Sequence, residues 1–298
     1  MKLGFIGLGQ MGKPMALNLL ESGDELIVYD QAPNNYPEFK QQGARVARVL
    51  QDTAEAEIIF CSLPNSEIVY EVVLGKKGLK QFLRPGQIIV DTSTIKYSTT
   101  LDLAKELGAL GVEFLDAPVS GMEARAKEGT LTIMCGGEHE VFTKVTPYLR
   151  WIADKILYMG KSGCGQLTKL INQLLFDING AALAEILPMS VKLGLDPEKV
   201  GEVVNSGTGR SYASEFFIPA ILKGSFTGGY PMKQAYKDLA SGAEISANLC
   251  IPMPVLSAAT TTYQVALLRG LGDRDKGGMI GVFEELLQVQ YRKSPTEN

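Results

Sequence analysis

The sequence has few of the residues from which metal centres, disulfide frameworks and histidine-based active sites are built. It contains a single histidine, His139, and four scattered cysteines that form no Cys-x-x-Cys pair: Cys61, Cys135, Cys164 and Cys250. Scattered cysteines disfavour a zinc site, so we expect no metal and a reduced, cytoplasmic protein. His139 is expected to open a helix at the surface, which disfavours a mechanism that uses a histidine as acid or base.

Charge and hydropathy disfavour two further classes of protein. The net charge is −4 and charged residues make up 21% of the chain, so no basic excess favours binding to nucleic acid. No uninterrupted apolar run approaches the length needed to cross a bilayer, so we expect no membrane partner. Apolar residues make up 45% of the 298 residues, which is ordinary for a globular protein of two domains.

The N-terminal segment has the order strand, glycine turn, helix, strand and acidic residue. The apolar run Leu3–Ile6 leads into Gly7-x-Gly9-x-x-Gly12, and a second apolar run, Leu26–Tyr29, ends at Asp30. A glycine triplet alone is a weak signal, but in this order it is typical of a dinucleotide-binding βαβ unit. The alternative is a glycine turn in an α/β protein that binds no dinucleotide.

Each part of this unit has a physical role in binding a dinucleotide. The first glycine permits a tight turn, the second lets the backbone approach a pyrophosphate, and the third lets helix and strand pack closely. Free N–H groups at the helix start favour the pyrophosphate. Asp30 would accept hydrogen bonds from the adenosine ribose and repel a 2′-phosphate, which favours NAD over NADP. The predicted cofactor contacts in the turn are Gly7, Leu8, Gly9, Gln10, Met11 and Gly12.

The rest of the first half alternates apolar runs with helical patterns, as a parallel sheet with helices between its strands requires. We therefore expect a doubly wound parallel (Rossmann) α/β domain over residues 1–162, which binds its ligand beyond the carboxyl ends of the strands. The later strands are expected at Glu57–Ser62, Gln87–Val90, Val112–Leu115, Thr130–Cys135 and Lys155–Tyr158. The helices between them are expected near Glu67–Leu74, Ser98–Leu107 and Glu138–Leu149.

After a glycine-rich break the pattern is helical throughout, so residues 163–298 are expected to form an all-α domain. The stretch from Gln166 to about Leu193 is apolar on most of its circumference, which predicts a long buried helix. Pro188 is expected to kink that helix or end it early. The polar tail Tyr291–Asn298 is expected to fray. Further helices are expected at Pro197–Val204, Ala213–Leu222, Met232–Ala247 and Met253–Leu268.

Three polar residues, Lys169, Asn172 and Gln173, lie on one face of the expected buried helix, because positions i, i+3 and i+4 are neighbours. Apolar surroundings disfavour an ammonium group and lower its pKa toward the range of a general acid or base. The alternative is that Lys169 reaches solvent from the helix start. Periodicity alone leaves both interpretations open.

Four motifs stand in a fixed order along the chain. They are GFIGLGQMGKPMA at Gly4–Ala16, DAPVSG at Asp116–Gly121 with Ala126 and Gly129-Thr130-Leu131, Gly163-x-Gly165-x-x-x-Lys169-x-x-Asn172, and Lys237-Asp238-Leu239. With these motifs nearly the whole chain resembles the β-hydroxyacid dehydrogenases, the family of 3-hydroxyisobutyrate dehydrogenase and tartronate semialdehyde reductase.

The resemblance implies roles for particular residues. Lys169 matches the family's catalytic lysine, and Ser120 and Gly121 match the residues that hold the substrate carboxylate. The other implied substrate positions are Asn172, Tyr230 and Asp238. The positions implied to touch the cofactor are Leu63, Pro64, Thr94 and Lys237.

Two positions depart from the family pattern. The family usually has a second glycine where this chain has Met122. The Met122 side chain would narrow the carboxylate cradle, which is the name we give to the site that Ser120 and Gly121 form for the substrate carboxylate. It often has two asparagines after the lysine, where this chain has Asn172 and Gln173, and glutamine reaches further. Outside the family's pattern, Arg125 and Arg210 are candidates to bind a second anionic group of the substrate, or else are ordinary solvated arginines.

We therefore expect an NAD-dependent oxidoreductase that acts on a small β-hydroxy acid or its semialdehyde in the cleft between two domains. Reductases of tartronate semialdehyde, succinic semialdehyde or sulfolactaldehyde and a 2-(hydroxymethyl)glutarate-type dehydrogenase remain alternatives, as does an NAD-binding sensor without turnover. 6-Phosphogluconate dehydrogenase has similar motifs, but it is longer and has a histidine in the lysine segment. The apolar helical surface and the resemblance predict a homodimer or homotetramer.

Overall fold

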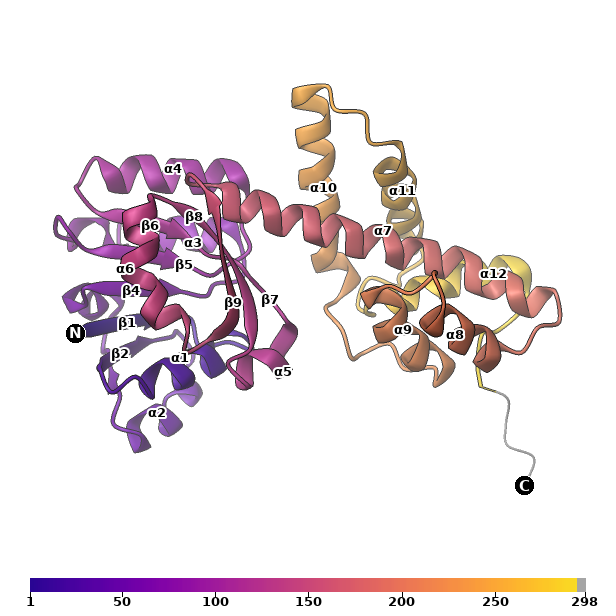
Figure 1. Cartoon of the computed structure of the whole chain (residues 1–298), viewed down its shortest axis with the longest axis horizontal. Coiled ribbons are helices and arrows are strands. Elements are labelled where there is room, and N and C mark those ends of the chain that lie inside the picture. The colour runs from indigo at the N-terminus through magenta and orange to yellow at the C-terminus, as the bar shows by residue number, and fades with distance from the viewer. Residues whose placement is uncertain (294–298) are drawn as a thin grey trace. The chain divides into compact units, whose positions relative to one another are not determined.

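The chain forms two compact units, Met1–Lys169 and Leu170–Asn298. The structure is a computed structural model that describes residues 1–293 (Figure 1). The division falls inside one continuous helix, α7 (Cys164–Lys192), whereas the boundary expected from the sequence lies at the glycine break before that helix. The first six residues of α7, Cys164–Lys169, therefore belong to the first unit.

The first unit is built on one nine-stranded sheet. Its strands are β1 (Lys2–Ile6), β2 (Glu25–Tyr29), β3 (Arg45–Val46), β4 (Ile58–Cys61), β5 (Ile88–Asp91), β6 (Glu113–Asp116), β7 (Val119–Ser120), β8 (Leu131–Gly137) and β9 (Ala153–Gly160). Its α-helices are α1 (Gly12–Leu20), α2 (Pro37–Gln41), α3 (Ser66–Leu74), α4 (Tyr97–Gly108), α5 (Met122–Lys127) and α6 (His139–Leu149). The strand order is β3-β2-β1-β4-β5-β6-β8-β7, with β9 paired to β8.

The six strands from β3 to β6 in this order run parallel, as predicted. The winding reverses at β1, which has β2 on one side and β4 on the other, and ligands of such sheets bind beyond the carboxyl end of that strand. The remaining strands depart from the prediction, because β8 is antiparallel to both β6 and β7. The two-residue strands β3 and β7 were not predicted, since two residues carry no periodicity.

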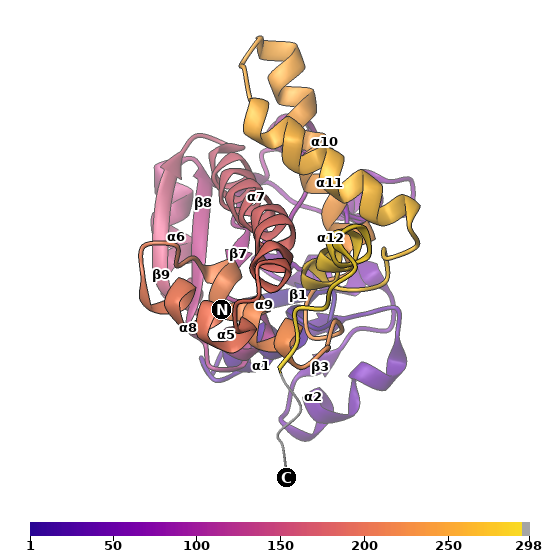
Figure 2. The same cartoon turned by 90° about the vertical axis from the view of Figure 1, so that its right-hand side faces the viewer.

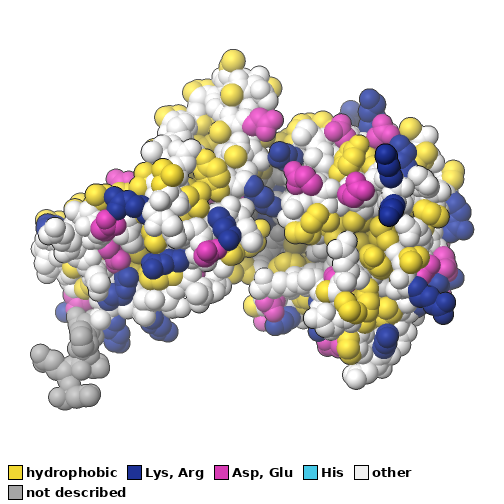
Figure 3. All heavy atoms as spheres, turned by 180° about the vertical axis from the view of Figure 1, so that it is seen from behind, with side chains coloured by type: hydrophobic (Ala, Val, Ile, Leu, Met, Phe, Trp, Pro, Cys, Tyr) yellow, Lys and Arg dark blue, Asp and Glu magenta, His cyan; other side chains and the backbone are white. Residues whose placement is uncertain are grey.

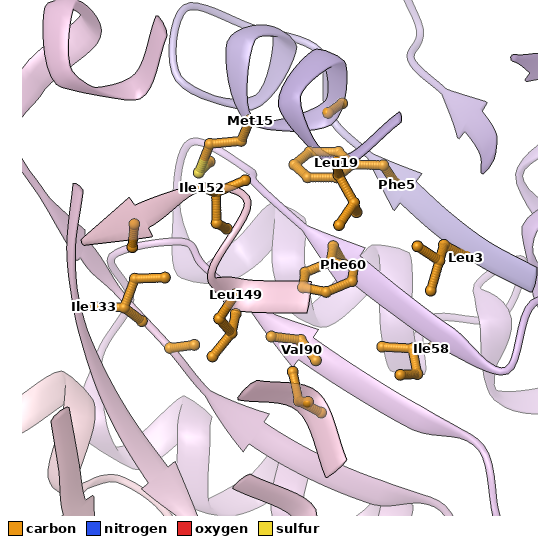
Figure 4. Packing of buried hydrophobic residues seen from close by; sticks show 14 of the residues in the cluster. Leu3, Phe5, Met15, Leu19, Ile58, Phe60, Val90, Ile133, Leu149 and Ile152 are labelled. Atoms are coloured by element: carbon orange, nitrogen blue, oxygen red, sulfur yellow. The ribbon is translucent and has the colours of Figure 1, made fainter. Parts of the chain in front are cut away.

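Helices cover both faces of this sheet, which confirms the doubly wound arrangement. Alternate residues of a strand point to opposite faces, so Ile58 and Phe60 of β4 belong to one hydrophobic core and Ile59 belongs to the other. Helices α1 and α6 pack on the first core, part of which is shown in Figure 4. Helices α3 and α4 pack on the second. Because these strands are buried on both faces, their sequences are continuous apolar runs.

The second unit is helical. Besides the rest of α7 it contains α8 (Pro197–Ser206), α9 (Tyr212–Leu222), α10 (Met232–Leu249), α11 (Pro254–Leu268), the 3₁₀ turn η4 (Lys276–Met279) and α12 (Ile280–Leu287). Helices α10 and α11 lie side by side (Figure 2). Within residues 170–293 the only β pairing is the single bridge between Pro231 and Asp275, so the all-α prediction is confirmed for the described part.

Helix α7 differs from its prediction in two respects. It continues through Pro188 to Lys192, so the proline does not end it early. It is not buried all round, because Ile171 and Leu175 are 60% and 59% exposed. Hydrophobic side chains are also exposed elsewhere on the protein, and Figure 3 shows some of them on one face. The most apolar 18-residue window of the helix has a mean hydropathy of 1.4, so by length and composition the helix is able to cross a bilayer. The sequence did not indicate this, because polar residues interrupt the apolar run. A core helix of a soluble protein meets the same criterion of length and hydropathy, so this feature alone is weak evidence for a membrane span.

A buried ion pair joins α7 to the start of η4 inside the second unit. The Lys276 ammonium contacts Asp177 Oδ1, and both side chains are buried. The Tyr263 hydroxyl donates to the same oxygen at 3.3 Å, and the Lys276 Nζ lies 4.4 Å from the centre of the Phe176 ring. Burial raises the pKa of Asp177 to about 6, and the charge of Lys276 opposes that rise. A buried charge of this kind requires its partner, so the pair ties the two elements together.

The start of the C-terminal tail is held in place, so the expectation that it frays is wrong for Tyr291 to Lys293. The Tyr291 side chain is fully buried, and its hydroxyl donates to the Pro197 carbonyl oxygen at 2.7 Å. Arg292 forms an ion pair with Glu284 at 2.5 Å. Residues 294–298 lie outside the described part of the chain. A single buried aromatic in a polar segment gives no periodic signal, which is why the sequence did not reveal it.

Candidate active site

The glycine turn between β1 and α1 leaves room for a ligand at one of its three glycines. A Cβ on Gly12 would lie 1.9 Å from the Gly7 carbonyl oxygen, and Gly7 has a φ of +93°. Both positions therefore require glycine. At Gly9 a Cβ would meet nothing within 4 Å, so the backbone there borders open space. The turn fits a pyrophosphate that approaches the chain at Gly9.

Asp30 follows β2, and its carboxylate is bonded to this turn. The Leu8 N–H donates to Oδ2 at 2.5 Å, and the Ala32 N–H donates to Oδ1 at 2.7 Å. A carboxylate offers about four lone-pair sites, so acceptors remain for ribose hydroxyls. The Leu8 side chain is buried and Met11 packs on the core, so these two residues offer the cofactor mainly their backbone.

The loops after β4 and β5 carry three further predicted cofactor residues to the carboxyl edge of the sheet. Leu63 and Pro64 follow β4, and Thr94 follows β5. The two loops are joined, because the Leu63 N–H donates to the Ser93 hydroxyl at 2.8 Å. The structure therefore gathers these residues at the same edge as the glycine turn.

Ser120, Gly121 and Met122 form the bend between β7 and α5. Ser120 pairs with Thr132 of the antiparallel strand β8, Gly121 has a φ of +143°, and Met122 has a φ of +61°. A left-handed backbone costs a non-glycine residue about 1–2 kcal/mol. The bend thus has a backbone suited to glycine at position 122 but carries an exposed methionine side chain.

Helix α5 is tied to the dinucleotide turn. The Gln10 amide donates from Nε2 to Glu123 Oε2 at 2.7 Å, and the Asn18 amide of α1 donates to the Ala126 carbonyl oxygen at 2.9 Å. Glu123 also forms an ion pair with Lys127 at 2.6 Å, and these two partners lower the pKa of its carboxyl. The predicted carboxylate cradle is therefore fixed beside the predicted cofactor turn within one unit.

The start of α7 is held by the carboxylate of Asp116, the last residue of β6. Oδ1 accepts a hydrogen bond from the Gly163 N–H at 2.7 Å, and Oδ2 accepts one from the Gln166 N–H at 3.0 Å. The free N–H groups at a helix start carry partial positive charge, so a carboxylate there is stabilising. The Asp116 carboxylate fixes the helical turn that precedes Lys169.

The Gln166 side chain joins that turn to the loop after β5. Its Nε2 donates to the Ser93 carbonyl oxygen at 2.7 Å, and its Oε1 accepts from the Ile95 N–H at 3.2 Å. These two bonds lie on either side of Thr94. Lys169 follows on the next turn of α7 and is 7% exposed, which excludes the alternative that it extends into solvent. One buried glutamine therefore anchors both the lysine's helix and a predicted cofactor loop.

Asp116 has a buried acidic neighbour in Asp91, the last residue of β5. The two residues are direct partners in the β5–β6 register, and both are fully buried. Burial raises the pKa of Asp91 to about 7 and that of Asp116 to about 6, and N–H groups of the α7 start oppose the rise at Asp116. Asp91 Oδ1 accepts from the Ser93 N–H at 3.0 Å, while Oδ2 has no hydrogen-bond partner within residues 1–293. We infer that Asp91 holds a proton near neutral pH and that Asp116 carries the charge.

The remaining predicted residues belong to the second unit. Within it, Gln173 Nε2 donates to Asp238 Oδ2 at 3.4 Å, and Asn172 Nδ2 donates to Gln173 Oε1 at 3.5 Å. Both distances are longer than the usual range of N–H···O hydrogen bonds, so both bonds are weak. Asp238 is buried in α10, next to Lys237, and Tyr230 is 48% exposed just before that helix. The structure therefore brings together Gln173 and Asp238.

Four buried residues organise this site, and none of them had a role predicted from the sequence. They are Asp91, Ser93, Asp116 and Gln166. One signal was available, since two successive apolar strands each end in an aspartate, and carboxyl ends of parallel strands meet at one edge of a sheet. No pattern in the sequence indicated that a glutamine of α7 reaches the loop after β5.

This chain is similar to known proteins over nearly its whole length. A family model for the NAD binding domain of 6-phosphogluconate dehydrogenase matches residues 2–160, and one described as the NAD-binding part of NADP-dependent 3-hydroxyisobutyrate dehydrogenase matches residues 163–283. A 2-(hydroxymethyl)glutarate dehydrogenase of Eubacterium barkeri is 40% identical over 97% of this chain and 96% of its own. The mitochondrial 3-hydroxyisobutyrate dehydrogenase of Rattus norvegicus is 34% identical over 92% of this chain and 84% of its own.

The fold is shared with solved structures. A 3-hydroxyisobutyrate dehydrogenase from Salmonella typhimurium superposes with a TM-score of 0.86 at 27% identity, over 95% of this chain and 100% of that one. Fold, glycine turn and matches together define a nicotinamide-dependent dehydrogenase that acts on a hydroxyl group. Within that class, the chain belongs to the β-hydroxyacid dehydrogenase family.

Substitution of two glycines by alanine separates cofactor binding from folding. Gly12→Ala should lower the free energy of unfolding by about 3 kcal/mol or more, because its Cβ collides with the Gly7 carbonyl. Gly9→Ala should change it by less than about 0.5 kcal/mol, because its Cβ meets no protein atom, yet should weaken NADH binding about tenfold. Thermal unfolding and NADH fluorescence titration measure the two effects. Unchanged NADH affinity in Gly9→Ala would contradict a cofactor site at this turn.

The two in-register aspartates should respond differently to the same substitution. Asp116→Asn should lower stability by about 1.5–3 kcal/mol and reduce turnover, because an amide keeps one acceptor oxygen where two N–H groups donate. Asp91→Asn should be tolerated, because a protonated carboxyl resembles an amide. Since its folded pKa is raised, the parent Asp91 contributes stability that is lost as the pH rises from about 4 through about 7. The stability of Asp91→Asn relative to the parent should therefore increase over that range, and equal effects of the two substitutions would refute the assignment of the proton.

Proposed function

We propose that Lys169 is the general acid/base of a reversible hydride transfer between NAD and a small β-hydroxy acid. The observation that carries this proposal is the burial of Lys169 on a helical turn that Asp116 and Gln166 hold beside the cofactor loops. A proton-transferring group must be fixed relative to the reacting atom, and a shift of about 1 Å can cost a hundredfold in rate. The anchored helix start provides that fixation.

In the proposed chemistry Lys169 transfers the proton, and Ser120 and Gly121 bind the substrate carboxylate. When bound, the nicotinamide ring supplies the acceptor or donor of the hydride. In oxidation the Lys169 amine takes the proton from the substrate hydroxyl as the hydride leaves the same carbon, and in reduction the ammonium returns a proton to the alkoxide oxygen. The Ser120 hydroxyl and the Gly121 N–H hold the substrate carboxylate and so fix the position of the reacting carbon.

The other predicted residues complete this proposal. Asn172, Gln173, Tyr230 and Asp238 are proposed to bind the substrate, together with Met122. Leu63, Pro64, Thr94 and Lys237 are proposed to contact the cofactor. The named relatives act on 3-hydroxyisobutyrate or on 2-(hydroxymethyl)glutarate. In both acids a hydroxymethyl group is attached to the carbon that bears the carboxyl group, and we propose this class of substrate. Tartronate semialdehyde, succinic semialdehyde and sulfolactaldehyde remain alternatives within the same chemistry.

Replacement of the lysine tests the proposal. Lys169→Ala should reduce kcat by about 10²–10⁴-fold, the usual contribution of a general acid/base, while the affinity for NADH is retained. The matched control is Lys161→Ala, which removes an exposed lysine at the glycine break before α7 and should leave kcat unchanged. The assay follows NADH absorbance with a panel of hydroxy acids and semialdehydes.

Two outcomes of this assay would count against the proposal. Turnover close to that of the parent in Lys169→Ala would show that another group transfers the proton. A parent protein that binds NADH but turns over no member of the panel would favour the alternative of a non-catalytic NAD-binding sensor.

We further propose that NAD is preferred over NADP because Asp30 would repel a 2′-phosphate. The carboxylate is already bonded to two backbone N–H groups, which holds it at the end of β2. We expect kcat/KM with NAD to exceed that with NADP by about tenfold or more, which corresponds to about 1.4 kcal/mol. A preference for NADP would contradict this role of Asp30.

We also propose a cytoplasmic homodimer or homotetramer. The proposal is supported by the four free cysteines and by the exposed apolar side chains of α7, among them Ile171, Leu175 and Ile186. Such side chains on one helix indicate a surface that is covered in the assembled protein. Sedimentation should give a mass above the 32.2 kDa of one chain.

A further inference from the structure

Two arginines were candidates to bind a second anionic group of the substrate, and the structure distinguishes them. Arg210 forms an ion pair with Glu215, with its Nε 2.6 Å from Oε1. Its charge is therefore balanced by a neighbour on the next helix. Arg125, in contrast, has no carboxylate at ion-pair distance within residues 1–293, and its Nε contacts the Thr130 hydroxyl at 3.5 Å. A bond of that length is weak.

The aliphatic part of Arg125 packs directly on the carboxylate cradle. A Cβ at Gly121 would lie 2.9 Å from the Arg125 Cβ and 3.1 Å from its Cδ. The arginine stem thus fills the space beside Gly121 that a side chain would otherwise occupy. This contact fixes the first carbons of the side chain, so less conformational entropy is lost when the exposed guanidinium binds a ligand.

The acidic residue nearest to the cradle in sequence does not neutralise Arg125. Glu123 is already bonded to Gln10 at 2.7 Å and to Lys127 at 2.6 Å. Glu128 contacts the Thr130 hydroxyl at 3.4 Å but forms no ion pair with Arg125 within the described residues. The guanidinium therefore adds a positive charge next to the cradle without an ion-pair partner among the described residues.

Met122 adds an apolar surface at the same bend. Its backbone is left-handed, a conformation that favours glycine, and its side chain is 37% exposed. A strained conformation of this kind is typical of a functional position. The cradle is thus bordered by a thioether side chain and a guanidinium, which together suit an aliphatic segment that ends in an anion.

We infer that Arg125 is a specificity-determining residue that binds a second carboxylate of the substrate, so that the enzyme takes a dicarboxylic hydroxy acid. The inference rests on the proposed function, in which Ser120 and Gly121 hold the first carboxylate. The planar guanidinium binds a carboxylate through two parallel N–H···O bonds. The methylene groups between the two carboxylates lie against Met122.

A pair of substrates that differ only at the distal group tests this inference in the full-length protein. They are 2-(hydroxymethyl)glutarate and 2-(hydroxymethyl)pentanoate, in which a methyl group replaces the distal carboxylate. The ratio of their kcat/KM values should favour the dicarboxylate in the parent. Arg125→Met, which keeps an unbranched stem against Gly121, should lower that ratio about tenfold to a hundredfold, the range of a charge-assisted hydrogen bond. The change should arise mainly from KM for the dicarboxylate.

Arg150→Met is the matched control, because Arg150 is an exposed arginine at the end of α6 in the same unit. It should leave the ratio unchanged. Arg125→Lys should give an intermediate ratio, because lysine retains the charge without the planar fork. A parent that prefers the monocarboxylate, an unchanged ratio in Arg125→Met, or the same fall in Arg150→Met would each overturn the inference.

Calorimetric titration of glutarate and of pentanoate into the NADH-loaded protein separates this inference from the proposed function. Glutarate should bind about tenfold more weakly to Arg125→Met than to the parent, by the loss of the same charge-assisted bond, and pentanoate should not. Binding of glutarate that depends on Arg125, in a parent without turnover, would refute the proposed function and retain the second carboxylate site. If the parent turns over substrate but the parent and Arg125→Met bind glutarate with equal affinity, the proposed function is retained and the second carboxylate site is refuted.

Discussion

The carboxylate of Asp116 at the start of α7 is the interaction on which the candidate site depends. It accepts hydrogen bonds from the Gly163 and Gln166 N–H groups and so fixes where the helix begins. Lys169 follows on the next turn, and its position is therefore set by a residue of β6, the strand that leads into the carboxylate cradle. A helix start that lacked this partner would leave N–H groups unsatisfied in a buried place, which is costly. The same bond thus stabilises the fold and positions the lysine.

A second buried carboxyl, that of Asp91, lies on the strand next to Asp116, and burial disfavours the ionised form of both groups. Asp91 and Asp116 face each other across β5 and β6 without access to water. Burial is the main cause that raises the pKa of both groups, and the charge of Asp116 adds a smaller rise at Asp91. The backbone N–H donors favour ionisation of Asp116 over that of Asp91, which is why we infer that Asp91 is the group that holds a proton. From Asp91 the network continues through Ser93 to Leu63, and it therefore underlies the cofactor loops as well.

Much of the fold was predictable, because the strands of the first unit are buried on both faces and appear as apolar runs. The glycine turn, the helical second half and the family were correctly predicted. The burial of α7 was not, because the hydrophobicity of a helix does not reveal whether its own chain covers it, and Ile171 and Leu175 remain exposed. The antiparallel position of β8 and the fixed start of the tail also escaped prediction, since both depend on contacts between residues far apart in the chain.

The sequence by itself determined the local features: the tight turn that requires Gly7 and Gly12, the acidic residue after β2, and a lysine among apolar neighbours. These follow from backbone sterics and from periodicity, which act over a few residues. Only the tertiary structure decided that Asp91 and Asp116 share one buried edge, and that Arg210 but not Arg125 has an ion-pair partner among the described residues. Strand register and ion pairing are set by packing between distant segments, and no pattern along the chain encodes which charges end up side by side.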